Sequence, residues 1–573
     1  MRYRRYQSTY RRFPKTFINQ PFFVSKGMET IKTIIQQSQH RVLALDVYPG
    51  AEVTPLLTAL QAGYKVIHLE QFYIDSATMD ANVKPYLTED RVFGKMNPIR
   101  LDDYLLPGAI EQMRQLIATH AKPVLIYGLG ASLIDPQALN VMVDCPRWEL
   151  QLQYRHGGTN FHTHNPQEDP LRKYKRGFFL DWVIGDAHKF KQFHQFQFFI
   201  DVSDPKIPTM INQASMQKGI AEMIRQPFRL VPYFDPGVWG GQWMKEICDL
   251  PAGPKNYAWA FDGVPEENAV HLTDGHHVFA MPAQNLVYFG KDILLGKHVY
   301  ERFGSHFPIR FDFLDTMQGG NLSLQVHPKT AYIQKEFGMP FTQDESYYIL
   351  DCDADGSVYL GLKEAVDETQ FWDTLFKANA GLMKQPDIES MVNHYPVKRH
   401  DHVSIPAGTI HCSGKNTMVL EISATPYIFT FKLWDWGRLG LDGLPRPVHL
   451  DHGRANLDFR HDTTFVEREL KVPPQVIRPQ EEKTGLHASQ FIETRRMTIT
   501  KDQPMLVDNH ESVNMLNLVE GEAIEIHDAA NRFAPFNVSY AETFIVPASV
   551  KQYWIKTTKD HPTMVLQAYV RKL

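Results

Sequence analysis

The chain has 573 residues, 43% of them hydrophobic and 22% charged, a composition typical of a globular protein with two to four domains. Its 60 Lys and Arg against 65 Asp and Glu give a formal net charge of -5, which argues against nucleic acid or an anionic membrane as a partner. Its four cysteines form no CxxC pair and no apolar run approaches membrane-spanning length, so we expect a soluble cytoplasmic protein.

Residues 1–39 begin with the basic stretch MRYRRYQSTYRRFPKTF, which contains no acidic residue. No apolar core of the signal-peptide type follows it. We interpret the segment as a flexible N-terminal arm, in preference to a weakly matching transit peptide.

Residues 40–227 alternate strand-like and helix-like segments. The runs RVLALDVYP, YKVIHLEQFYI and KPVLIYGLGASLI have the apolar character of buried strands, and TPLLTALQAG and PGAIEQMRQLIATHA have helical patterns. Alternation of this kind predicts a parallel α/β sheet.

The turn after the first of these strands, DVYPGAEVTPLL, stands where a phosphate-binding loop would lie. Ala51 and Glu52 follow Gly50, in place of the Lys and Ser/Thr that hold phosphates and Mg²⁺. Two interpretations stay open: a nucleoside-kinase-like domain that has lost its ATP site, and an unrelated doubly wound domain. Neither is expected to turn over ATP.

After a Pro- and Gly-rich break near residue 228 the pattern changes to short β-runs separated by turns. These are HHVFAMP, NLVYFG, NLSLQVHP, ESYYILDC, GSVYLGL, HVSIPAGTIHCSG, TMVLEIS and FTFKLWDW. The spacing predicts a jelly-roll barrel over residues 228–470, with a helical insertion near 364–394. The same pattern of short β-runs continues in SVNMLNLVEGEAIEIHD and AETFIVPASVKQYWI and predicts a second barrel over residues 471–573. The expected fold is therefore α/β plus all-β, with a parallel α/β domain followed by tandem cupin (jelly-roll) barrels.

The stretch NLSLQVHP carries two possible metal ligands on one strand face. Side chains alternate along a strand, so Gln325 and His327 point the same way. Glu345 opens the later run ESYYIL, and His411 follows a tight glycine turn in IPAGTIH. Two imidazoles, an amide oxygen and a carboxylate suit Zn²⁺. The alternative is the polar face of a half-buried strand.

The order LSLQVHP, ESYYILDC, IPAGTIHCSGKNTMVLEIS resembles the type I mannose-6-phosphate isomerase family, as do VWGGQWMKEICDLP and AETFIVPAS. The likeness covers roughly residues 228 to 573. It implies that Gln325, His327, Glu345 and His411 bind one zinc ion. It also implies interconversion of mannose 6-phosphate and fructose 6-phosphate through an enediol, in which zinc acts as a Lewis acid.

The sequence departs from the family pattern at several places, two of which are positions of the candidate active site. Gln343 stands where a lysine is common, and Lys432 stands where an arginine is common. Glu421 is retained, and Glu421, Lys432 and Arg438 are the candidate catalytic groups; Arg438 can alternatively be a surface salt-bridge partner. The leading interpretation is a zinc-dependent isomerase of a small phosphorylated sugar. A non-catalytic phosphosugar sensor or regulator and an isomerase of a different phosphosugar are the alternatives.

Overall fold

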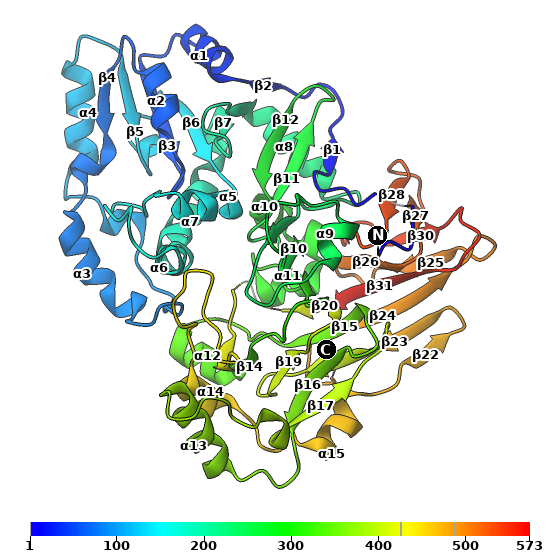
Figure 1. The fold of residues 1–573 in the computed structure, drawn as a ribbon. Helices are drawn as coiled ribbons and strands as arrows, with labels where there is room; N and C mark the ends of the chain where they lie inside the picture. Colours follow the sequence, from blue (N-terminus) through cyan, green and yellow to red (C-terminus); the bar gives the residue numbers. More distant parts are fainter. Residues whose placement is uncertain (1, 8, 425–426, 486, 573) are drawn as a thin grey trace.

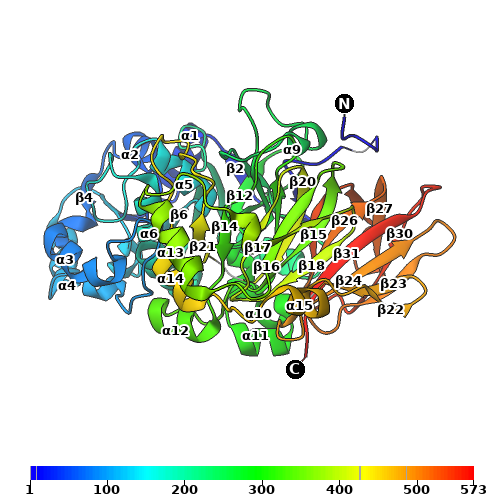
Figure 2. The same ribbon diagram turned by 60° about the horizontal axis from the view of Figure 1, so that its bottom comes forward.

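The structure is a computed structural model that describes residues 2–7, 9–424, 427–485 and 487–572. It mixes helices with several sheets, arranged as three units that lie side by side (Figures 1 and 2). We call them the α/β unit (residues 24–223, blue to cyan), the first β unit (233–470, green to yellow) and the second β unit (475–570, orange to red). None of the described helices combines the length and apolar composition that crossing a bilayer requires.

The α/β unit is built on a seven-stranded sheet in the order β2–β8–β7–β6–β3–β5–β4. The five strands from β7 to β4 pair in parallel, and β8 and β2 extend that sheet antiparallel. The parallel arrangement expected from strand–helix alternation is therefore present. The strands are β2 (Val24–Lys26), β3 (Val42–Val47), β4 (Lys65–His68), β5 (Val124–Tyr127), β6 (Leu139–Asp144), β7 (Phe198–Asp201) and β8 (Thr209–Asn212).

Helices cover both faces of this sheet. Alternate residues of its strands therefore belong to different clusters of buried side chains. On β3, Leu43 and Leu45 belong to one cluster and Val42 and Ala44 to the other. A strand buried on both faces reads as a continuous apolar run, as VLALDV does. The helices are α1 (Met28–Gln37), α2 (Thr54–Leu60), α3 (Ser76–Leu87), α4 (Ala109–Thr119), α5 (Arg147–Arg155), α6 (Pro170–Arg176), α7 (Trp182–Gln192) and α8 (Gln213–Met223).

Asp46, near the carboxyl end of β3, lies at the sheet edge where open α/β sheets bind their ligands. It is fully buried and accepts hydrogen bonds from the backbone of Gly130 (3.0 Å) and from the backbone (3.1 Å) and hydroxyl (2.5 Å) of Ser132. His188 Nε2 lies 2.7 Å from its carboxylate. The chain's own donors therefore satisfy this carboxylate.

We expect Asp46→Asn to lower the free energy of unfolding by about 3 kcal/mol, because it removes one partner of a buried ion pair. Burial acts to raise the pKa of Asp46, but His188, Ser132 and Gly130 outweigh it and the pKa is lowered. A carboxyl group with a lowered folded-state pKa contributes stability above its ordinary pKa and loses it as the pH falls through the folded value. Urea unfolding at pH 7 and pH 3 should therefore show the gap between wild type and variant shrinking in acid. An unchanged gap contradicts this account, and the exposed Asp102→Asn serves as the control.

The first β unit contains two antiparallel sheets. The six-stranded sheet has the order β18–β15–β20–β13–β10–β9, and the five-stranded sheet has the order β17–β16–β19–β14–β21. The strands of the first are β9 (Tyr233–Asp235), β10 (Trp259–Gly263), β13 (Arg310–Asp315), β15 (Glu345–Cys352), β18 (His402–Ile405) and β20 (Thr417–Ser423). Those of the second are β14 (Leu324–Val326), β16 (Ser357–Leu362), β17 (Val392–Pro396), β19 (His411–Ser413) and β21 (Phe431–Trp434).

Helices lie between the strands of this unit, and one of them corrects a sequence-based expectation. The run NLVYFG, expected to be a strand, lies inside helix α10 (Gln284–Leu295). Leu286, Gly290 and Leu294 are buried at four-residue spacing, which is helical, and a short apolar run does not distinguish the two states. The other helices are α9 (Trp243–Ile247), α11 (Lys297–Phe303), α12 (Thr330–Phe337), α13 (Glu368–Asn379), α14 (Leu450–Asn456) and α15 (Thr463–Phe465).

The second β unit repeats the two-sheet plan with the orders β22–β23–β24–β31–β26–β29 and β25–β30–β27–β28. Its strands are β22 (Gln475–Arg478), β23 (Glu481–Thr484), β24 (Ile492–Ile499), β25 (Met505–Asp508), β26 (Asn514–Glu520), β27 (Ala523–Asp528), β28 (Phe536–Ser539), β29 (Thr543–Val546), β30 (Gln552–Lys556) and β31 (Thr563–Val570).

The N-terminal segment ties the units together. β1 (Lys15–Phe17) pairs in parallel with β11 (Ala269–Thr273), which also pairs with β12 (Val278–Pro282). β2 and α1, also within the first 39 residues, belong to the α/β unit. The predicted arm is therefore ordered over much of its length.

Candidate metal centre

Three of the four predicted metal ligands lie on two adjacent strands and their ends. Gln325 on β14 is the direct cross-strand partner of His411 on β19, so their side chains share a sheet face. His327 follows β14 on the same face as Gln325. Gly408, with a φ of +87°, makes the turn that leads into β19.

Glu345 opens β15 in the facing six-stranded sheet and meets both histidines. His327 Nε2 lies 3.0 Å from one carboxylate oxygen of Glu345, and His411 Nε2 lies 2.7 Å from the other. Donor atoms of the three residues all lie within 4.8 Å of one another, and the three side chains are fully buried. Gln325 reaches the same point, with its amide nitrogen 3.2 Å from His411 Nε2.

Backbone carbonyls fix the orientation of both imidazoles. His327 Nδ1 lies 2.8 Å from the carbonyl oxygen of Phe429, and His411 Nδ1 lies 2.9 Å from that of Thr409. Each Nδ1 therefore carries the proton it donates, and in a neutral ring each Nε2 presents a lone pair to Glu345. Metal-binding histidines are held in this way.

The charges of this group are mutually dependent. Burial acts to lower the pKa of His327, but the Glu345 carboxylate raises it further than burial lowers it. Burial acts to raise the pKa of Glu345, but His327 and His411 bring it well below its ordinary value. A carboxylate that faces two nitrogen lone pairs is stabilised by a positive charge placed among them.

These residues fit a divalent transition metal. His327 Nε2 and Glu345 Oε1 are buried and have no hydrogen-bond partner in the described part of the chain. Two imidazole nitrogens and a carboxylate oxygen are ligands that Zn²⁺ prefers. The amide of Gln325 completes the set when it is flipped so that its oxygen, in place of its nitrogen, faces the group.

The candidate catalytic residues lie at different distances from this group. Gln343 Nε2 donates to Glu345 at 3.3 Å and to Glu421 at 3.5 Å, so Glu421 lies beside the candidate metal ligands. Burial and the negative charges of Glu345 and Asp312 raise the pKa of Glu421 well above its ordinary value.

Lys432 and Arg438 have different surroundings. Lys432 on β21 is the direct cross-strand partner of Gln325, which places its side chain on the ligand-bearing face of the sheet. Burial and Arg446 lower the pKa of Lys432 to about 7. Arg438 instead donates to Asp435 (2.6 Å) and to the carbonyl of Asn321 (2.7 Å), as a salt-bridge residue does.

Two charged residues near the group were missed in the sequence. Arg310 and Asp312 on β13 are buried and ion-paired at 3.5 Å, and Asp312 is the cross-strand partner of Glu421. Burial acts to lower the pKa of Arg310, but Asp312 and Glu421 raise it. The alternation of charged and apolar residues in RFDFLD was the available signal.

The chain was compared with family models, curated proteins and solved structures. A family model described as a domain of unknown function (DUF8485) matches residues 27–225. The chain is 22% identical over 348 residues to "Putative mannose-6-phosphate isomerase YvyI" of Bacillus subtilis (strain 168), covering 59% of this chain and 98% of that protein. It is 26% identical over 234 residues to mannose-6-phosphate isomerase ManA of the same strain, covering 40% and 67%. Over part of its length, the chain is similar in sequence to mannose-6-phosphate isomerases.

A solved structure of mannose 6-phosphate isomerase from Bacillus subtilis aligns with 60% of this chain and the whole of that one, at 18% identity and a TM-score of 0.47. These alignments cover 59% and 60% of the chain and leave the rest unmatched. The DUF8485 match falls on the α/β unit.

Proposed function

We propose that the protein is a zinc-dependent aldose–ketose isomerase that interconverts mannose 6-phosphate and fructose 6-phosphate. The observation that carries the proposal is the convergence of two carbonyl-oriented imidazoles on the buried Glu345 carboxylate. Homology to mannose-6-phosphate isomerases supports the substrate class. We also propose that the two β units are tandem cupin barrels, and that the α/β unit is kinase-like without a phosphate-binding loop.

The reaction moves a proton between C1 and C2 of the sugar and passes through a negatively charged enediolate. Zn²⁺, held by Gln325, His327, Glu345 and His411, would supply Lewis-acid polarisation of the substrate oxygens. Glu421 lies beside these ligands through Gln343 and is our candidate for holding the transferred proton.

Charge stabilisation falls to the cationic side chains of β21 and the loop after it. Lys432 is the candidate for the developing oxyanion, because no described residue forms an ion pair with it and it shares a face with Gln325. Arg438 is already held by Asp435, so we assign it a secondary part.

A coupled assay for fructose 6-phosphate formed from mannose 6-phosphate tests the proposal. Metal-stripped protein should be inactive, and stoichiometric Zn²⁺ should restore turnover. Conversion of another hexose or pentose phosphate in place of mannose 6-phosphate would keep the isomerase and change its substrate. Absence of any conversion by metal-loaded protein rejects the enzyme.

A non-catalytic phosphosugar sensor is the second candidate, and one observation favours it. The buried ring of Phe93 from the α/β unit stacks on Phe429 at 5.7 Å, so this unit contacts the surroundings of the candidate metal ligands. Phe429 is the residue whose carbonyl orients His327. Tight phosphosugar binding without turnover is the result that distinguishes the sensor.

A further inference from the structure

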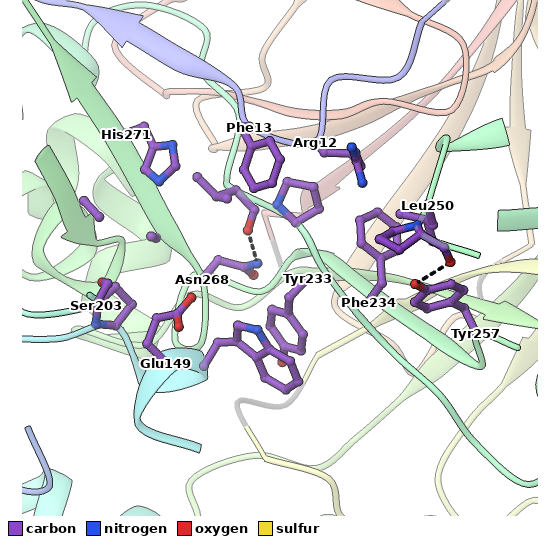
Figure 3. Close-up of a pocket in the computed structure, with 17 residues that line it drawn as sticks. Arg12, Phe13, Glu149, Ser203, Tyr233, Phe234, Leu250, Tyr257, Asn268 and His271 are labelled. Carbon is purple, nitrogen blue, oxygen red and sulfur yellow. Dashed lines mark hydrogen bonds between the residues drawn. The ribbon is translucent and has the colours of Figure 1, made fainter. Parts of the chain in front are cut away.

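A cavity lies where the N-terminal segment, the α/β unit and the first β unit meet (Figure 3). Its volume is about 330 Å³, within the range of small-molecule sites. The N-terminal segment contributes Arg12 and Phe13, and the start of α5 contributes Trp148 and Glu149. The α/β unit also contributes Pro146 and Ser203, and the rest of the wall comes from the first β unit and the residues just before it, including His271 on β11. None of these residues belongs to the metal centre.

The floor of the cavity is aromatic and rigid. Trp148 and Tyr233 stack at 3.9 Å with an interplanar angle of 10°, and Phe261 stacks on Tyr233 at 4.9 Å. Arg155 covers the indole of Trp148 at 5.1 Å and is itself paired with Asp235 at 2.8 Å. A preformed apolar floor binds flat ligands without reorganising.

Several polar residues of the lining are already engaged. Asn268 donates to the carbonyls of Val231 and Phe261, both at 2.7 Å, and Tyr257 donates to Pro251 at 3.2 Å. The Ser203 hydroxyl donates to Asp201 at 2.6 Å. These residues shape the cavity and have little hydrogen-bonding capacity left for a ligand.

Three ionisable side chains of the lining are not engaged. Within the described ranges, the side chains of Arg12, Glu149 and His271 form no hydrogen bond or ion pair, and Nδ1 of His271 is buried. Figure 3 shows Glu149 and His271 at one end of the cavity and Arg12 at the other. Partially buried ionisable groups without partners are costly, and a ligand that pairs with them offsets that cost.

Electrostatics make the two ends different. Burial, with the negative charge of Asp201, raises the pKa of Glu149 to about 7, and burial, with Lys15, lowers the pKa of His271 to about 4. A neutral imidazole and a carboxyl group at the same end of the cavity offer both donors and acceptors, which suits the edge of a nitrogen heterocycle. The guanidinium of Arg12 suits a phosphate or carboxylate.

Phe13 supplies an independent observation. Its ring is 65% exposed at the cavity rim, although it belongs to the segment that leads into β1. In Figure 3 the ring lies between His271 and Arg12, above Tyr233. A planar ligand placed between this ring and the floor would bury apolar surface that the protein leaves in water.

We propose that this cavity binds a small anionic molecule with a planar nitrogen heterocycle, with Glu149 and His271 contacting the polar edge of the ring and Arg12 the anionic group. A nucleoside monophosphate has this chemistry. The site is independent of the proposed isomerase reaction, and its occupant would contact all three parts of the chain at once.

Isothermal titration of the full-length protein with AMP, GMP, CMP and UMP tests the proposal. At least one should bind with a 1:1 stoichiometry, and at least tenfold more tightly than adenosine or inorganic phosphate, which each carry one half of the recognised chemistry. Failure of all four to bind at millimolar concentration overturns the proposal. If inorganic phosphate binds as tightly as the tightest nucleotide, the cavity does not recognise the heterocycle, and that part of the proposal is rejected.

Variants locate the binding. Glu149→Ala and Arg12→Ala should each weaken the tightest nucleotide at least tenfold, whereas the exposed Glu111→Ala and Arg100→Ala should not. The His327→Ala variant should bind it as wild type does, because the metal residues lie elsewhere. Unchanged affinity in Glu149→Ala and Arg12→Ala, with circular dichroism showing a native fold, places the nucleotide at another site and rejects this one.

Discussion

Replacement of His327 by alanine should remove the stoichiometric metal from the protein. The variant loses one of two imidazoles that face Glu345, and loss even of groups that only orient a ligand costs 10–100-fold in metal affinity. Removal of a ligand itself should cost at least about 100-fold. His411→Ala should behave in the same way, because its Nε2 faces the other oxygen of the same carboxylate. Elemental analysis after purification with Zn²⁺ measures both.

The exposed His561→Ala is the matched control and should keep its metal. Circular dichroism separates metal loss from unfolding, since only folded variants are informative. Full metal retention by both His327→Ala and His411→Ala would remove the site assignment. If only one of the two variants retains the metal, the histidine replaced in that variant is not a ligand, and a site of three ligands remains.

Lys432→Ala should abolish isomerase activity while the metal stays bound. Loss of one oriented donor to a developing oxyanion costs on the order of 3 kcal/mol, about a hundredfold in rate. Lys432 faces the same side of the sheet as Gln325 but forms no ion pair with a described residue, so its removal breaks no ion pair. Activity and metal content, measured on the same preparation, give the result.

Two comparison variants sharpen this test. Lys432→Arg should retain or raise the rate, because a guanidinium can grip an oxyanion at two points. Arg438→Ala should have a smaller effect than Lys432→Ala, since Arg438 is held by Asp435 and Asn321. An active Lys432→Ala, or metal loss in that variant, contradicts the role given to the lysine.

Local patterns in the sequence predict much of this architecture. Neighbouring residues suffice to predict the buried strands of the parallel sheet and the alternating strands of the β units. They also suffice to predict that Gln325 and His327 share a face. NLVYFG shows the limit, because six apolar-rich residues fit a strand and a helix equally well and packing decides.

The site depends on contacts that no local pattern contains. The carbonyls of Phe429 and Thr409 orient the two imidazoles, and a backbone carbonyl leaves no trace in residue type. Arg438 pairs with Asp435 because of the conformation of the loop that carries them. The sequence alone therefore does not decide whether Arg438 is catalytic or a salt-bridge partner. The cavity of Figure 3 is also non-local, since it joins residues more than 250 positions apart.

The pairing of β1 with β11 has a consequence for folding during synthesis. Lys15 and His271 are register partners, so β1 has no strand to join until more than 250 further residues have been made. At about 5–20 residues per second, this interval is on the order of 13–50 s. During that time Phe17 and the basic segment before it stay undocked on the ribosome, while the parallel sheet, whose strands end at Asp201, can already close. The N-terminal segment therefore docks long after it is made, so chaperones have long access to the segment that carries Arg12 and Phe13.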